Sequence, residues 1–285
     1  MSLVCLFPGQ GSQSKGMGAD LFDRYPDWTT LADELLGYPI RELCVDDPRG
    51  ELGQTRFTQP ALFAVNALTY RARLDDGKPV PAFVAGHSLG EYNALLAAGV
   101  FDFASGLSLV ARRGQIMGQV SGGGMAAVIG MEPAAIQDVL NASDAGRRLD
   151  VANFNSYDQT VIAGPKDDLA TVKPQFEAAG VRAYIPLNVS APFHSRYMRD
   201  AQAEFAASLD SVVFNSPQIP VISNVTGKPY DSELLRQTLS EQIGNSVRWL
   251  ETITYLLGQP GPEFEEVGPG TVLTKLVAQI RKRLR

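Results

Sequence analysis

The chain has little cysteine and little histidine, with two residues of each among 285. Cys5 and Cys44 lie far apart in the sequence and show no metal-ligand spacing, which argues against a disulfide scaffold and is typical of a reducing compartment. We expect two unremarkable core thiols, no bound metal and no cofactor. Because histidine is the usual proton acceptor near neutral pH, histidine chemistry is limited to His87 and His194.

Long apolar runs and a positive net charge are also absent. The longest nearly apolar stretch, residues 94–101, is too short to span a bilayer, and residues 3–7 are too short for a secretory signal. The net charge of −6 gives no global field that attracts nucleic acid. We therefore expect a soluble, cytoplasmic protein with neither membrane nor nucleic-acid partners. A solvated helix end accounts for the basic residues Arg281, Lys282, Arg283 and Arg285.

Strand and helix patterns alternate in the first part of the chain. Residues 3–7 and 80–85 have the pattern of buried strands. Thr58 before Pro60 indicates a helix start. Helical patterns cover three segments, residues 20–36, 58–74 and 91–98. This alternation predicts an α/β core with a parallel sheet, in which active sites lie at the carboxyl ends of the strands.

The pattern changes after the glycines at 122–124. Strands and helices then follow in the order β-α-β-β-α-β, at residues 125–130, 133–141, 151–154, 160–163, 169–179 and 182–189. This order is ferredoxin-like. We predict that residues 1–123 and 190–285 form the α/β core, that residues 124–189 form a ferredoxin-like subdomain inserted into it, and that a cleft lies between them.

The pentapeptide Gly86-His87-Ser88-Leu89-Gly90 joins the second predicted strand to a helix. In this context it is typical of a nucleophile elbow, which lifts a serine hydroxyl clear of the sheet and points the first helical amides at an incoming carbonyl oxygen. A glycine-rich turn is the alternative. The glycine-rich loop at 9–16 matches neither the dinucleotide nor the P-loop signature, so we expect it to offer a main-chain amide to an oxyanion instead.

A nucleophilic serine needs a neighbouring base. His87 is adjacent to Ser88 and points to the opposite face of an extended strand, which leaves His194. His194 opens a helical pattern whose inward face predicts a buried ring, kept neutral by the helix N-terminus. A structural core histidine is the alternative reading. Spacing does not identify a third member, either among the acidic residues between Ser88 and His194 or as an amide.

Arg113 lies in the helical run 103–120 on the same stripe as apolar residues, whereas Arg112 lies on the polar face. An unpaired buried guanidinium is costly. Arg113 therefore either pairs with an internal carboxylate or binds a carboxylate of the substrate through two hydrogen bonds. The second interpretation predicts an acidic acyl group.

Several segments together resemble the malonyl-CoA:acyl-carrier-protein transacylase family: residues 7–13 (FPGQGSQ), 86–91 (GHSLGE), 113–114 (RG), 193–194 (FH), 223–227 (SNVTG), and Gln242 with 247–249 (VRW). The resemblance spans nearly the whole chain and implies a hydrolase-like core with a ferredoxin-like insert. Residues 54–68 and 176–184 resemble the discrete, trans-acting acyltransferases of polyketide synthases more than the fatty-acid enzyme.

The resemblance also implies roles for individual residues. Ser88 is the nucleophile and His194 the general base, Arg113 binds the malonyl carboxylate, and Gln242 orients the histidine. The main-chain amides of two further residues form the oxyanion hole, and two side chains set acyl selectivity; these are Gln10 and Leu89, and Phe193 and Met117 respectively. Pro192 stands where the family pattern has alanine.

The implied reaction is ping-pong transfer of a malonyl group from malonyl-CoA to the phosphopantetheine thiol of an acyl carrier protein, for polyketide or otherwise fatty acid biosynthesis, by a monomer. Two other readings stay open. A serine acyl-thioesterase or hydrolase acting on carrier-bound acyl groups shares Ser88 and His194 but has no need of Arg113. A non-catalytic docking module needs none of the three.

Overall fold

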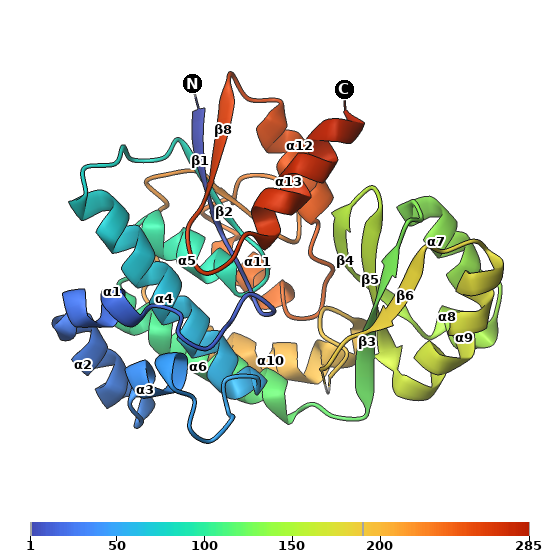
Figure 1. Ribbon diagram of the computed structural model, residues 1–285, viewed down its shortest axis with the longest axis horizontal. Coiled ribbons are helices and arrows are strands. Elements are labelled where there is room, and N and C mark those ends of the chain that lie inside the picture. The colour runs from blue at the N-terminus through green and yellow to red at the C-terminus, as the bar shows by residue number, and fades with distance from the viewer. Residues whose placement is uncertain (1, 190, 285) are drawn as a thin grey trace.

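The structure is a computed structural model that describes residues 2–189 and 191–284. Within these residues the strands form two separate four-stranded sheets (Figure 1). The first sheet is parallel and has the order β7-β2-β1-β8, with β1 (Ser2–Phe7), β2 (Phe83–Gly86), β7 (Val221–Ile222) and β8 (Pro262–Glu266). The mixed α/β architecture predicted from the sequence is confirmed.

Helices cover both faces of the parallel sheet. Cys5 and Phe7 of β1 pack into one apolar cluster with helices α4, α5 and α6, whereas Val4 and Leu6 face a second cluster built on α12 and α13 (Figure 1). Parallel sheets are buried on both faces for this reason. The helices of this part are α1 (Ala19–Arg24), α2 (Pro26–Leu36), α3 (Ile40–Val45), α4 (Thr55–Asp75), α5 (Gly90–Ala97), α6 (Phe103–Gln119), η1 (Arg196–Met198), α10 (Arg199–Leu209), α11 (Leu235–Glu241), α12 (Trp249–Leu257) and α13 (Val272–Arg283).

Several predicted element bounds are wrong. The helix predicted at 169–179 spans Lys166–Ala178, and the strand predicted at 182–189 spans Ala183–Pro186. Helix α4 begins at Thr55 and not at Thr58, whose hydroxyl donates to the main-chain carbonyl of Gln54 one turn earlier. Pro60 therefore lies in the second turn of α4, beyond the first-turn position that proline usually takes. Strand β2 begins at Phe83, where its pairing with β1 begins, and Val80 is 67% exposed.

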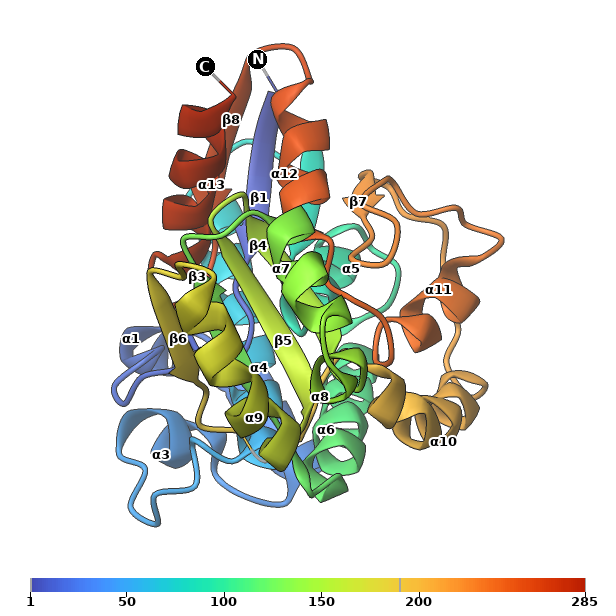
Figure 2. The same cartoon turned by 90° about the vertical axis from the view of Figure 1, so that its right-hand side faces the viewer.

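The second sheet is antiparallel and has the order β4-β5-β3-β6. Its elements are β3 (Gly123–Ile129), α7 (Pro133–Asn141), α8 (Asp144–Arg147), β4 (Asp150–Ser156), β5 (Gln159–Pro165), α9 (Lys166–Ala178) and β6 (Ala183–Pro186). Apart from the short helix α8, this is the predicted ferredoxin-like order. The helices α7, α8 and α9 cover its outer face (Figure 2). The proposed domain boundaries stay a prediction.

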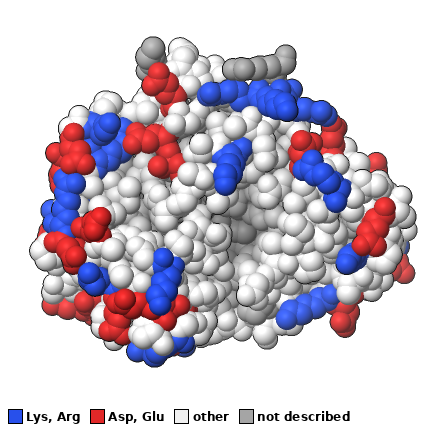
Figure 3. Space-filling model, viewed as in Figure 1, with Lys and Arg blue, Asp and Glu red and all other residues white. Residues whose placement is uncertain are grey.

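The inner face of the antiparallel sheet packs on the parallel part. Met125 and Ala127 of β3 belong to the same apolar cluster as Phe7 of β1. The edge strand β4 is joined to the core segment at Val247, because the Phe154 amide donates to the Val247 carbonyl over 2.9 Å. Figure 3, which has the viewpoint of Figure 1, shows a hollow near the middle of the visible surface, where side chains are mostly uncharged.

The scarce cysteines and the basic C-terminal segment have ordinary structural roles. Cys5 and Cys44 are buried and free, and burial raises the pKa of the Cys5 thiol to about 12. Arg281, Lys282 and Arg283 occupy the last turn of α13, where cations favour the helix dipole. The predicted fourth member, Arg285, lies outside the described residues. In the described part of the chain, the helices are all too short or too polar to cross a membrane.

Candidate active site

Ser88 lies on the tight turn between β2 and α5. Its φ is +50°, a conformation that non-glycine residues rarely adopt. The turn is closed by glycines: a Cβ on Gly86 would lie 1.9 Å from the carbonyl carbon of Gly90, and one on Gly90 would lie 2.0 Å from the Phe7 oxygen. The strand, the strained serine and the close-packed glycines are the geometry expected of a nucleophile elbow.

His194 is the side chain that meets the serine. Its Nε2 lies 2.8 Å from Ser88 Oγ, although 106 residues separate the two in sequence. Its Nδ1 lies 2.8 Å from the main-chain oxygen of Gln242. Since a carbonyl only accepts, Nδ1 carries the proton and Nε2 is free to accept one from the serine. Ser88 and His194 thus form a hydrogen-bonded pair of the predicted kind.

The ring of His194 is neutral for a different reason from the one expected. It precedes η1 and does not open helix α10, which begins at Arg199, although the later inward positions are buried as predicted: 198, 201, 205 and 209. Burial, followed by the positive charge of Arg113, lowers the pKa of His194 to about 3. Desolvation disfavours the charged imidazolium, so the base form persists across the neutral range.

The other histidine takes no part in this pair. His87 Nε2 lies 2.8 Å from Asn155 Oδ1 of β4, and its ring meets the Trp249 ring edge-on at 5.4 Å. Burial lowers the pKa of His87. His87 thus connects the elbow to the antiparallel sheet, as its position on the opposite face predicts.

Arg113 is fully buried beside the serine. Its NH1 donates to Gln59 Oε1 over 2.7 Å, and its NH2 donates to Gln242 Oε1 over 2.8 Å and to Ser88 Oγ over 3.2 Å. These partners are neutral, and among the described residues no carboxylate makes an ion pair with this guanidinium. The buried Nε has no partner within the same residues. Arg112, its neighbour, pairs with Glu204 at the surface.

Gln242 contacts both sides of the site. Its main-chain carbonyl, and not its side-chain amide, accepts the hydrogen bond from His194 Nδ1. The side-chain oxygen accepts from Arg113, and Nε2 donates to the Ser88 carbonyl over 2.7 Å and to Glu91 Oε2 over 2.6 Å. Sequence reasoning identified the residue but not which of its groups faces the histidine.

Three buried polar residues were missed as members of the site. Gln59 receives a hydrogen bond from Arg113, and Asn224 Oδ1 accepts from the Ser88 amide over 2.7 Å. Glu91 is fully buried, and burial raises the pKa of its carboxyl to about 7. The signal for Glu91 and Asn224 was present, because they lie within the segments 86–91 and 223–227 that carry the resemblance.

A small cavity of about 110 Å³ lies over the Ser88 hydroxyl, between the elbow and the antiparallel sheet. The side chains predicted to set selectivity, Phe193 and Met117, both line it. Gln10 and Leu89 line it as well, and within the described residues neither of their main-chain amides donates to a protein acceptor. The predicted site residues therefore all lie in the wall of one cavity, except Gln242, which lies behind that wall.

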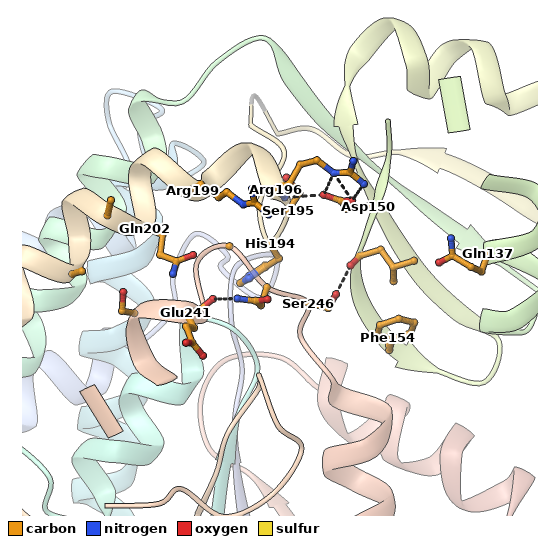
Figure 4. A pocket seen from close by; sticks show the side chains of 16 residues that line it. Gln137, Asp150, Phe154, His194, Ser195, Arg196, Arg199, Gln202, Glu241 and Ser246 are labelled. Carbon is orange, nitrogen blue, oxygen red and sulfur yellow. Dashed lines mark hydrogen bonds and ion pairs between the residues drawn. The ribbon is translucent and has the colours of Figure 1, made fainter. Parts of the chain in front are cut away.

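Two larger grooves reach this region. One, of about 640 Å³, shares Gln10 and Val189 with the cavity and has Arg56 and Lys166 on its rim. The other, of about 1130 Å³, reaches His194 from the side of α10, where Arg196 pairs with Asp150 (Figure 4). The described residues contain no group of three histidine, cysteine or acidic side chains placed to hold a metal ion.

Fold and site together define an α/β protein with the backbone geometry of a nucleophile elbow, a hydrogen-bonded Ser–His pair and a buried arginine beside the serine. The chain belongs to the acyl transferase domain family, which matches residues 4–282.

Named relatives extend this assignment. The chain is 50% identical over 281 residues to the polyketide biosynthesis malonyl CoA-acyl carrier protein transacylase PksC of Bacillus subtilis, covering 98% of this chain and 97% of PksC. It is 53% identical over 275 residues to the polyketide biosynthesis protein ThaF of Burkholderia thailandensis, covering 96% of this chain but only 24% of ThaF. A crystal structure of malonyl CoA-acyl carrier protein transacylase from Burkholderia pseudomallei superposes with a TM-score of 0.95, at 50% identity and 99% coverage of both chains.

Proposed function

We propose that this chain transfers a malonyl group from malonyl-CoA to the phosphopantetheine thiol of an acyl carrier protein in polyketide biosynthesis. The observation that carries the proposal is Arg113, whose buried guanidinium donates to Ser88 Oγ over 3.2 Å and, among the described residues, has only neutral hydrogen-bond partners. Such a cation is paired once a substrate carboxylate binds beside it.

The first half-reaction acylates the serine. Ser88 Oγ attacks the thioester carbon of malonyl-CoA as His194 Nε2 takes its proton. The main-chain amides of Gln10 and Leu89 donate to the oxygen on which negative charge develops. When the tetrahedral intermediate collapses, the carbon–sulfur bond breaks and the departing CoA sulfur takes the proton from His194. A malonyl ester on Ser88 and free CoA are the products.

The second half-reaction runs the same steps on a thiol. The phosphopantetheine thiol of the carrier gives its proton to His194 and attacks the malonyl ester, and the departing Ser88 oxygen recovers the proton. Arg113 holds the carboxylate of the malonyl group throughout, which orients the ester toward the incoming thiol. Because the pKa of His194 is lowered, its ring is neutral at the start of each half-reaction and can accept a proton. The protonated ring exists only within each step.

Two features favour transfer over hydrolysis of long acyl chains. A serine acyl-thioesterase needs no cation at the position of Arg113, and the cavity of about 110 Å³ suits a short acyl group. The names of the polyketide relatives support the choice of malonyl-CoA and of a carrier protein.

Carrier proteins are usually acidic, so Arg56 and Lys166 on the groove rim are candidates for the docking surface. The proposal places a monomer in the cytoplasm.

Intact-mass measurement tests this proposal. Wild-type protein mixed with malonyl-CoA is expected to gain one malonyl group, Ser88→Ala none, and addition of a phosphopantetheinylated carrier protein is expected to remove the group from the enzyme and place it on the carrier. An adduct on Ser88→Ala rejects the nucleophile. Release of free malonate faster than transfer to the carrier rejects the transferase in favour of the hydrolase.

A further inference from the structure

Among the described residues, Glu91 is a buried acid that neither lines the cavity nor pairs with a cation. It lies in the first turn of α5, three residues after Ser88, and is fully buried. Its Oε1 accepts from the Asn224 amide over 3.0 Å and from the Tyr230 hydroxyl over 2.6 Å. Its Oε2 accepts from Gln242 Nε2 over 2.6 Å. Three short hydrogen bonds therefore define where the carboxylate lies, and the one from Gln242 leads toward the site.

The contact with Gln242 determines which way the side-chain amide points. Nε2 faces two acceptors, the Glu91 carboxylate and the Ser88 carbonyl, whereas Oε1 faces the donors of Arg113. A reversed amide would place its NH2 group against the guanidinium and its oxygen against the carboxylate, leaving buried groups unpaired on both sides. In its ionised form the Glu91 carboxylate only accepts hydrogen bonds, and it then permits the observed orientation alone.

The same arrangement separates two opposite charges by one amide. Glu91 contacts Arg113 only through Gln242 and makes no ion pair with it, so the guanidinium stays available to bind another carboxylate. Hydrogen bonds in such a chain polarise one another in a low-dielectric interior. A carboxylate in direct contact with Arg113 would instead compete with an acidic acyl group for the same donors.

We propose that Glu91 is a positioning residue, which fixes the side-chain amide of Gln242 and through it aligns the guanidinium of Arg113 with the substrate carboxylate. The inference rests on the proposed malonyl transfer. It assigns Glu91 an effect on malonyl-CoA that acetyl-CoA, which has no free carboxylate, does not share.

The variant Glu91→Gln tests the inference, because a glutamine fills the same space but can present its own NH2 group to Gln242. We expect kcat/KM for loading of Ser88 to fall about tenfold with malonyl-CoA and less than about twofold with acetyl-CoA. In an Arg113→Ala background the same substitution is expected to change neither value by more than about twofold, since the two residues act through one contact. Loading is followed by intact mass, and thermal unfolding shows that each variant is folded.

Each outcome decides the matter. Equal losses on both acyl-CoAs, or an unchanged preference, reject the positioning role and leave Glu91 a structural residue. A second variant, Gln242→Leu, covers the case in which Glu91→Gln does not fold, and it keeps the main-chain carbonyl that faces His194. Its kcat/KM is expected to fall more with malonyl-CoA than with acetyl-CoA. An equal fall with both also rejects the role. A wild-type protein that forms no malonyl adduct rejects the proposed function itself, and this inference with it.

Discussion

Substitution of Arg113 by alanine is expected to remove the preference for malonyl-CoA over acetyl-CoA. The substitution deletes the donors that face the cavity and also the bonds to Gln59, Gln242 and Ser88. The lost bonds to the protein affect both acyl-CoAs, whereas the lost bond to a carboxylate affects malonyl-CoA alone. The ratio of the two kcat/KM values therefore isolates the role of Arg113 in recognition.

The size of the effect follows from burial. Removing one partner of a buried charge pair costs about 3–5 kcal/mol, which corresponds to a fall of at least about 10²-fold in the malonyl-to-acetyl ratio. The variant also leaves the side-chain oxygens of Gln59 and Gln242 without a donor, and each such buried group costs about 1–3 kcal/mol of folding free energy. We therefore expect a lower urea midpoint as well.

In the assay, malonyl-CoA and acetyl-CoA compete for Ser88. Intact mass gives the amounts of malonylated and acetylated protein before either ester on Ser88 reacts further. Arg112→Ala is the matched control, because Arg112 is the adjacent arginine on α6 and pairs with Glu204 at the surface. It is expected to keep the wild-type ratio. An Arg113→Ala protein that is folded and still prefers malonyl-CoA as strongly as wild type refutes carboxylate recognition by this residue.

Three further predictions concern the base, the elbow and the cavity. The rate of Ser88 loading with acetyl-CoA is expected to stay constant between pH 8 and pH 5, since burial lowers the pKa of His194 to about 3. A tenfold fall in this rate by pH 5.5, measured by quenched flow and mass, contradicts the prediction. Gly90→Ala is expected to lower the free energy of unfolding in urea by about 3 kcal/mol, because its Cβ would lie 2.0 Å from the Phe7 oxygen. Gly53→Ala, whose Cβ meets nothing within 4 Å, is the control and is expected to be neutral. Equal midpoints would contradict the packing argument. Phe193→Ser opens the wall beside Ser88 and should raise methylmalonyl-CoA loading relative to malonyl-CoA about tenfold in a competition assay, and an unchanged ratio removes Phe193 from acyl selection.

Elements whose start is marked by local chemistry were predicted well. Helix α7 has the predicted bounds, Pro133–Asn141, because proline at its first position marks the start. The same residue type misled the prediction of α4, where Pro60 lies one turn further in. The start of β2 depends on where β1 offers a partner, and that information is absent from residues 80–82 themselves.

The site was predictable where residue scarcity or a motif limited the choice. Only His194 was left as a base once His87 was assigned to the opposite face, and the structure places it 2.8 Å from Ser88 Oγ. The support behind the pair was not predictable in the same way. In the sequence Glu91 is only an acidic residue at the start of a short helix. Its proposed role depends on Gln242, 151 residues away, meeting it in the folded chain.

The pKa shifts of His194 and Glu91 are opposite in direction, and their effects on the pH dependence of the stability of the fold oppose each other. Burial lowers the pKa of His194 from 6.5 to about 3, so its contribution to stability is lost as the pH falls through that range. Burial raises the pKa of Glu91 from 4.5 to about 7, so its ionised form destabilises the fold and stability is regained as the pH falls from 7 to 4.5. Between pH 6.5 and 4.5 the two slopes cancel.

Glu91→Gln removes one side of this balance and makes it measurable. The shift of the Glu91 pKa corresponds to about 3 kcal/mol, which wild type regains on acidification from pH 7 to 4.5 and the variant does not. The unfolding free energy of wild type minus that of the variant is therefore expected to rise by about 3 kcal/mol over this range, and the other carboxylates cancel in the difference. A difference independent of pH means that burial does not destabilise the Glu91 carboxylate.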